Sequence, residues 1–219
     1  MSSMLLAADR LTNLGELAIF LYGLQRWEWL DRSRRLLAAW AGSCVVAAVG
    51  TALLTGTNGY DHIMLQLYLP LSALFAMGSL GALQTSRRSR DAFRIAGVLY
   101  AVIWAALTLT YEDLGKYSVI TGPIHHVMIT GGAAFTLQSA LRRVQGPLLG
   151  DPAAVVGMGF LAFAAPTAMI HPVLTIFRNE PTLDLLLVTR DLFALLGYAA
   201  LLHAIALPRF RRTLQRVAA

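Results

Sequence analysis

Residues 153–177 read AAVVGMGFLAFAAPTAMIHPVLTIF and contain no Asp, Glu, Lys or Arg. An α-helix crosses a hydrocarbon core about 30 Å thick with roughly 20 apolar residues. This stretch is longer than that and is followed at once by the turn-forming sequence RNEPT at 178–182. It therefore predicts a membrane-spanning helix.

Six further stretches have the same character. The seven predicted spans are residues 10–30, 35–56, 60–83, 92–111, 118–141, 153–177 and 182–206. The connections between them are short and rich in turn-forming residues, and no stretch remains for a soluble domain. We therefore expect an all-α, polytopic membrane protein, with residues 1–219 forming a single bundle of seven transmembrane helices.

The composition excludes most other classes of protein. Of the 219 residues, 57% are hydrophobic and 14% are charged, whereas a soluble domain carries about 25% charged residues. The mean hydropathy of +0.60 agrees with this. Cys44 is the single cysteine, so the sequence excludes an internal disulfide and a paired-cysteine metal site, and Cys44 is expected to be a small buried hydrophobe.

The basic residues predict the orientation. Fourteen of the 18 lysines and arginines lie near 26–35, 87–94, 142–143 and 209–216, at one end of the predicted bundle, and three (Arg10, Lys116 and Arg178) lie at the other. Lysine and arginine accumulate on cytoplasmic loops. We expect an outside N-terminus, a cytoplasmic C-terminus and a bacterial inner membrane. The net charge of +6 then reflects topology and contact with the lipid bilayer, and no nucleic-acid partner is expected.

Polar side chains inside the spans gather in the outer half of the predicted bundle. Ionisable residues are costly inside a bilayer, so they mark functional sites by default. Of the adjacent pair His125 and His126, which face different directions, one is expected to point inward. The sequence predicts an outward-facing polar pocket that binds a small molecule or ion, lined by Glu16, His62, Gln66, His126, His171, Arg190 and Asp191.

Several chemistries suit such a pocket, and the sequence contains no catalytic motif such as HExxH. This absence favours a binding role, as a sensor or transporter, over an enzyme. A sensor would need a membrane or cytoplasmic protein partner, because the tail after residue 206 is short. A structural ion pair between Glu16 and Arg190 is the alternative that needs no ligand.

Zinc and haem are the cofactors that the histidines could hold. His62, His126 and His171 would supply the three protein ligands of a catalytic zinc site, which predicts a membrane-embedded hydrolase as an alternative. A single b-type haem would need two of the same histidines on facing helices. A second haem at the inner side would have only His203 as a histidine ligand.

The stretch Arg190-Asp191-Leu192-Phe193-Ala194-Leu195-Leu196-Gly197-Tyr198 resembles the seventh helix of microbial rhodopsins. In that family an Asp precedes the retinal-binding lysine by four residues, and a Gly-aromatic pair follows. Asp191, Ala194, Gly197 and Tyr198 match the pattern, but Leu195 occupies the lysine position. The resemblance implies a rhodopsin-like seven-helix fold that lacks the retinal lysine, so covalent retinal is not expected.

Overall fold

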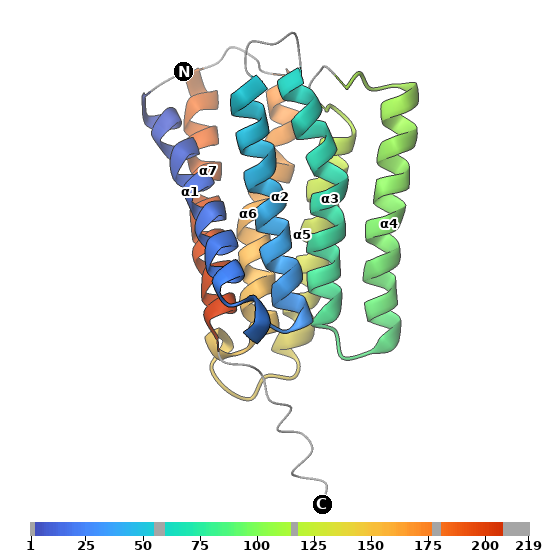
Figure 1. Ribbon diagram of the computed structural model, residues 1–219, viewed down its shortest axis with the longest axis vertical. Coiled ribbons are helices and arrows are strands. Elements are labelled where there is room, and N and C mark those ends of the chain that lie inside the picture. The colour runs from blue at the N-terminus through green and yellow to red at the C-terminus, as the bar shows by residue number, and fades with distance from the viewer. Residues whose placement is uncertain (1–2, 55–59, 115–117, 177–180, 208–219) are drawn as a thin grey trace, which may run out of the picture.

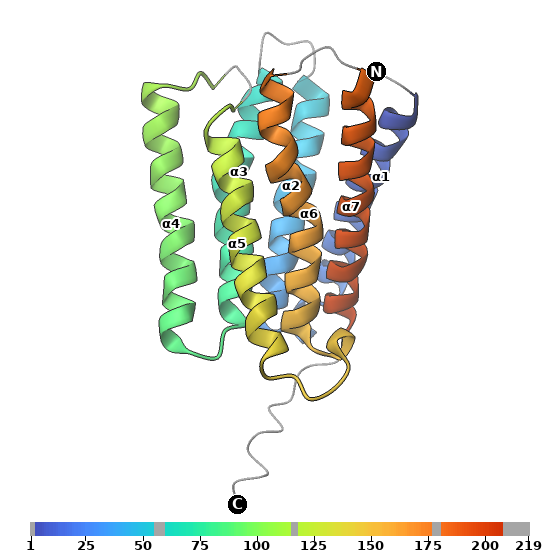
Figure 2. The ribbon, with the colours of Figure 1, turned by 180° about the vertical axis from the view of Figure 1, so that it is seen from behind.

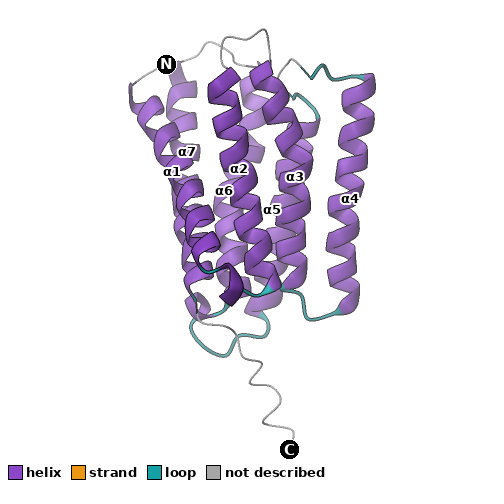
Figure 3. Ribbon diagram, viewed as in Figure 1, coloured by secondary structure: helices purple, strands orange, loops and turns teal. Residues whose placement is uncertain are grey.

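The computed structural model describes the chain except residues 1–2, 55–59, 115–117, 177–180 and 208–219. Side chains are described throughout the remainder except at 3–6, 9, 60–61, 171–176 and 181–183. The described part is helical, without strands (Figure 3). Its seven α-helices are α1 (Ser3–Gln25), α2 (Arg32–Leu54), α3 (Tyr60–Ala82), α4 (Arg87–Thr110), α5 (Thr121–Leu141), α6 (Pro152–Ile176) and α7 (Pro181–Ala206).

The seven helices run up and down in one bundle (Figure 1). Because each connection reverses the chain, α1, α3, α5 and α7 begin at the end of the bundle that carries the N-terminus, called here the N-terminal end. The connections between α1 and α2, α3 and α4, and α5 and α6 lie at the opposite, C-terminal end (Figures 1 and 2). The described basic residues of 26–35, 87–94 and 142–143 therefore share the C-terminal end.

The helix bounds agree with the predicted spans to within a few residues, except in the first. There the helix begins at Ser3 and ends at Gln25, and a 3₁₀ turn at Trp27–Trp29 follows it. Residues 26–30, predicted as the end of the first span, instead form the turn into α2. The Arg35 side chain fixes that turn by donating a 3.0 Å hydrogen bond from Nε to the carbonyl of Trp27.

Five helices are long and apolar enough to cross a membrane, namely α2, α3, α4, α6 and α7. Large apolar side chains face outward on them, including Leu53 at 78% and Leu109 at 82% exposure. This indicates an integral membrane protein. Among the described residues, α1 and α5 do not meet the same criterion. Helix α1 carries Asp9, Arg10 and Glu16, and α5 carries two histidines, four threonines or serines and a glutamine.

The core of the bundle lies around the Trp40 indole of α2, which is fully buried. Phe160 and Phe163 of α6 meet it edge-on, with ring centroids 4.9 and 5.3 Å away. Helix α6 packs extensively against both α5 and α7, and α2 packs against α3. Helix α4 lies at the edge of the bundle, against α3 (Figure 2). Buried polar side chains lie on both sides of this apolar centre: Gln66, His126, Thr167 and Asp191 toward the N-terminal end, and Ser79, Gln84 and Thr136 toward the C-terminal end.

Candidate functional site

A cavity of about 230 Å³ opens between α3, α5, α6 and α7. At a rise of 1.5 Å per residue, His126 lies about 8 Å and Arg190 about 14 Å from the N-terminal ends of their helices. The cavity is therefore in the half of the bundle toward the N-terminal end. Its lining residues are His62, Leu65, Gln66, Tyr68, Leu69, Ser118, Gly122, His126, Thr167 and Arg190.

Four of the seven residues predicted for the pocket line this cavity: His62, Gln66, His126 and Arg190. They come from three helices that are distant in sequence. Glu16 and Asp191 are not among the lining residues. The side chain of His171 lies outside the described residues.

Helix α3 presents one face to the cavity. His62, Leu65, Gln66 and Leu69 follow the i, i+3, i+4, i+7 spacing that places side chains on one side of a helix. Gln66 is 2% exposed, and its Nε2 donates a 3.4 Å hydrogen bond to the carbonyl of Asp113. Sequence reasoning found the two polar members of this face. The same spacing, counted from His62, would have found the two leucines.

The first turn of α5 is held in place by Glu112, in the connection that follows α4. Its Oε1 accepts hydrogen bonds from the backbone N–H groups of Ile120 (2.6 Å) and Thr121 (3.2 Å), and its Oε2 accepts one from the Thr121 hydroxyl (2.6 Å). Carboxylates are stabilising at helix N-termini, where N–H groups lack partners within the helix. Glu112 thus fixes the turn that carries Ser118 and Gly122 into the cavity wall.

Replacing Glu112 with alanine is expected to lower the free energy of unfolding by about 1–2 kcal/mol, because the N–H groups of Ile120 and Thr121 and the Thr121 hydroxyl lose their acceptor. The measurement is thermal or denaturant unfolding of the purified protein in detergent. Asp113→Ala is the matched control, since it removes an exposed carboxylate from the same connection and keeps the carbonyl that Gln66 contacts. Equal losses in the two variants would show that Glu112 acts only through its charge.

The adjacent histidines of α5 have different surroundings. His126 lines the cavity, and its ring meets Phe163 at a centroid distance of 5.9 Å. His125 is fully buried on the neighbouring face, between Tyr68 and Tyr100. The two imidazole centroids are 4.8 Å apart. One histidine therefore faces the cavity while the other joins the core.

The hydroxyl of Ser72 connects three helices behind the cavity. It accepts a 2.9 Å hydrogen bond from the Trp40 indole of α2 and donates one of 3.1 Å to the Tyr68 hydroxyl. Nε2 of His125 lies 3.1 Å from the same oxygen. Because a serine hydroxyl has a single hydrogen, that hydrogen is used toward Tyr68, and Nε2 of His125 must be the donor to Ser72. Sequence reasoning missed this group, since a serine in an apolar run gives no sign of its neighbours.

Arg190 and Asp191 form an ion pair at the cavity wall. The Arg190 Nε and Nη2 atoms donate to Oδ1 of Asp191 at 2.8 and 2.6 Å. The Asp191 side chain is 3% exposed and that of Arg190 is 26% exposed. No hydrogen-bond partner within the described part of the chain reaches Oδ2 of Asp191. The Arg190 guanidinium therefore places a positive charge at the cavity wall, and the buried Asp191 carboxylate balances that charge.

Glu16 contacts α7 at Tyr198, about two helical turns beyond the ion pair. Its Oε1 accepts a 2.7 Å hydrogen bond from the Tyr198 hydroxyl, and Tyr198 packs against Phe163 and Trp40. The alternative in which Glu16 pairs with Arg190 is not found among the ion pairs of the described residues. Glu16 instead ties α1 to α7.

The described residues contain no group of three or more His, Cys, Asp or Glu side chains that could hold a metal ion. His62 and His126 both line the cavity, and the third predicted zinc ligand, His171, lies outside the described side chains. Cys44, expected to be a small buried residue, is 4% exposed, and its thiol donates to the Tyr68 hydroxyl at 3.4 Å.

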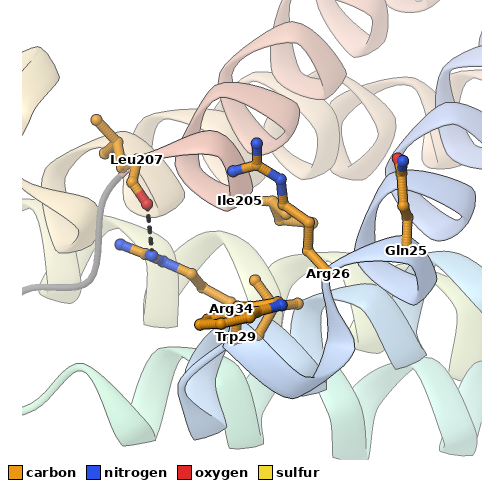
Figure 4. A pocket seen from close by; sticks show the side chains of 7 residues that line it. Gln25, Arg26, Trp29, Arg34, Ile205 and Leu207 are labelled. Atoms are coloured by element: carbon orange, nitrogen blue, oxygen red, sulfur yellow. Dashed lines mark hydrogen bonds between the residues drawn. The ribbon is translucent and has the colours of Figure 1, made fainter.

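A larger cavity, of about 500 Å³, lies at the C-terminal end between α1, α2 and α7 (Figure 4). Arg34 on its wall is 2% exposed, and its Nη1 donates a 2.7 Å hydrogen bond to the carbonyl of Leu207, just beyond α7. Carbonyls at a helix C-terminus lack partners within the helix. Arg34 therefore has the structural role of closing α7 against α2.

Comparison with known protein families, with characterised proteins and with solved structures yields no match. The functional proposal therefore rests on the residues of this chain.

Proposed function

We propose that the chain is a seven-span protein of a bacterial inner membrane that binds a small molecule or ion in the cavity between α3, α5, α6 and α7. The observation that carries the proposal is the shared cavity of His62, Gln66, His126 and Arg190. Polar residues cost free energy within a bilayer. Their convergence on one hollow, in the half toward the N-terminal end, supports a binding role in sensing or transport.

The packing of α1 and α5 supports seven spans. Helix α5 lies against α6 and α3, and α1 lies against α7 and α2. Both run alongside helices that are apolar enough to cross a membrane (Figures 1 and 2). The polar residues that lower their hydropathy include His125, His126 and Thr136, which are buried in the bundle rather than facing lipid. The excess of arginine at the C-terminal end supports a cytoplasmic position for that end.

The lining favours a small ligand that hydrogen-bonds on several sides. A volume of 230 Å³ corresponds to about seven or eight waters at about 30 Å³ each. Two imidazoles, one amide, two hydroxyl side chains at Ser118 and Thr167 and a guanidinium face this volume, beside Leu65 and Leu69. Pockets for drug-sized ligands have volumes of about 300–1,000 Å³, so the occupant of this cavity is smaller than a drug-sized ligand.

Thr167→Cys is expected to react with a membrane-impermeant, water-soluble thiol reagent added from the outside. The side chain lines the cavity and is 8% exposed, so the reagent can reach it only if water enters the cavity. Thiols react as thiolates, which form in water rather than in lipid. The background is low because Cys44 is buried. The measurement is the labelled fraction, by mass, in intact cells and after membrane disruption.

Met169→Cys is the matched control on the same helix. Met169 is 75% exposed on the outer surface of the bundle, which faces lipid in the proposed membrane arrangement, and its thiol is expected to stay unlabelled. Labelling of position 169 but not 167 would contradict the proposal, as would labelling of position 167 from the cytoplasmic side alone. A bound ligand is then identified as a compound that protects position 167.

A zinc-dependent hydrolase remains the second candidate, because His62 and His126 share the cavity. In that case the ion would bind to these imidazoles, with His171 as the third ligand of the hypothesis. Metal analysis and an absorption spectrum of the purified protein separate the candidates. One zinc per chain that is lost in His126→Ala favours the hydrolase, a Soret band favours haem, and neither is expected for a binding protein.

A further inference from the structure

A second polar cavity, of about 430 Å³, lies at the C-terminal end of the bundle, where α2, α4 and α6 begin. It is separate from the histidine-lined cavity and shares no residue with it. Its apolar lining includes Ala82, Leu83 and Pro152. Its charged lining residues are Arg32, Arg90, Arg94, Arg143, Asp31 and Asp151.

The two aspartates are engaged by the ends of the helices. Oδ1 of Asp151 accepts hydrogen bonds from the N–H groups of Ala153 (2.8 Å) and Ala154 (2.9 Å) in the first turn of α6. Oδ1 of Asp31 accepts a 3.1 Å hydrogen bond from the N–H of Arg34 in the first turn of α2. Both carboxylates therefore cap helices. Oδ1 of Asp151 also lies 3.7 Å from Nη2 of Arg143, and Oδ2 of Asp31 lies 3.5 Å from Nε of Arg34.

The four arginines leave the cavity with an excess of positive charge. They outnumber the two carboxylates, and the N-termini of α2, α4 and α6 add partial positive charge at the same end. Asp91 takes up part of the charge of Arg94 at 3.3 Å, and Asp151 takes up part of the charge of Arg143. Arg32 and Arg90 come from different helices and face the same hollow. Guanidinium groups bind phosphate oxygens with two parallel hydrogen bonds, which makes such a cluster suited to phosphate.

We propose that this cavity binds the phosphate of an anionic phospholipid headgroup. The cavity lies where helices that are apolar enough to span a membrane end, which is the depth of the headgroup layer. Basic pockets between transmembrane helices are suited to anionic headgroups. Leu83 and Pro152 beside the arginines offer apolar surface to the adjoining acyl chain. The proposal does not depend on the function of the histidine-lined cavity.

The test compares two variants that each remove two positive charges from the same end of the bundle. The double variant Arg32→Gln/Arg90→Gln changes the cavity, whereas Arg88→Gln/Arg142→Gln changes exposed arginines outside it. Binding of phosphatidylglycerol and of phosphatidylcholine to the purified protein in neutral detergent is measured by native mass spectrometry over a lipid titration. Glycerol 3-phosphate is the soluble phosphate probe.

We expect the protein to bind phosphatidylglycerol in preference to phosphatidylcholine. Each arginine near an anionic surface contributes about 1 kcal/mol, so losing both should weaken phosphatidylglycerol binding about tenfold or more in the cavity variant. The exposed-site variant should stay within about twofold of the unmodified protein. Arg32→Lys/Arg90→Lys keeps both charges but loses the paired hydrogen bonds of the guanidinium groups, so it should bind more tightly than the glutamine variant and less tightly than the unmodified protein.

Equal weakening in the two glutamine variants would overturn the proposal, because the attraction would then be a general effect of surface charge. Unchanged binding in the cavity variant would also overturn it. Binding of glycerol 3-phosphate without selective binding of phosphatidylglycerol would retain the phosphate site and overturn its assignment to a lipid. Failure of the cysteine-labelling test at Thr167 would leave this result unaffected, since the cavities are separate.

Discussion

Replacing Gly197 with alanine is expected to destabilise the bundle by about 3 kcal/mol, the upper part of the range for inserting a methyl group into a packed core. A Cβ at this position would lie 2.6 Å from the carbonyl oxygen of Gly159 and 3.1 Å from the backbone nitrogen of Phe163. Both atoms belong to the backbone of α6. They move only if the helix moves, so no side-chain rotation relieves the overlap.

The contact between α6 and α7 is reciprocal. A Cβ at Gly159 would lie 2.6 Å from Cδ2 of Leu201 and 3.0 Å from the carbonyl oxygen of Gly197. Small residues at such crossings let helix backbones approach closely in a membrane, where dispersion contacts drive association. The same two helices carry Thr167 and Arg190 to the cavity. Forcing them apart is expected to change the cavity as well as the stability.

The matched control is Gly131→Ala in α5, because no heavy atom other than the helix's own backbone lies within 4 Å of a Cβ built there. Alanine in place of glycine favours a helix by up to about 1 kcal/mol, so this variant should be unchanged or slightly stabilised. The melting temperatures of the two variants are measured by thermal unfolding in detergent, and size-exclusion chromatography checks that each variant is folded. Similar melting temperatures for Gly197→Ala and Gly131→Ala would contradict the close crossing.

The sequence was sufficient to predict the helices, because membrane spans are set by length and apolarity within a single segment. The polar residues of the cavity were predictable for a related reason. His62 and Gln66 share a helix face by spacing alone, and Arg190 is a charge inside an apolar stretch. The predicted end of the first span, at residue 30, was wrong, because the apolar and aromatic residues at 27–30 resemble a membrane span in composition although they form a turn.

Contacts between helices were beyond prediction from local pattern. The close contact of Gly159 and Gly197 depends on how α6 packs against α7. The hydrogen bonds of Ser72 likewise depend on Trp40 and His125, which lie on other helices. The Arg190–Asp191 pair also differs from simple helix geometry. Adjacent residues point about 100° apart, yet the long arginine side chain bends back to its neighbour.

Replacing Arg190 with glutamine is expected to lower the free energy of unfolding by about 3 kcal/mol at neutral pH. The Asp191 carboxylate, 3% exposed, would lose the two charged donors on Oδ1. Removing one partner of a buried ion pair costs about 3–5 kcal/mol, because it leaves an uncompensated charge. We expect the lower end of this range, since the Arg190 side chain is 26% exposed and water reaches the pair from that side.

Asp191→Asn should cost less than Arg190→Gln, because the charge it leaves on Arg190 is at the cavity wall rather than in the core. The double variant Arg190→Gln/Asp191→Asn removes both charges and leaves two neutral amides. If the ion pair is the cause, the double variant is more stable than Arg190→Gln alone, and the losses of the single variants are not additive. Additive losses in the double-mutant cycle would contradict coupling between the two side chains. The same double variant also tests ligand binding. If it is as stable as the unmodified protein, but a ligand no longer protects position 167 from the thiol reagent, then Arg190 takes part in binding as well as in stability.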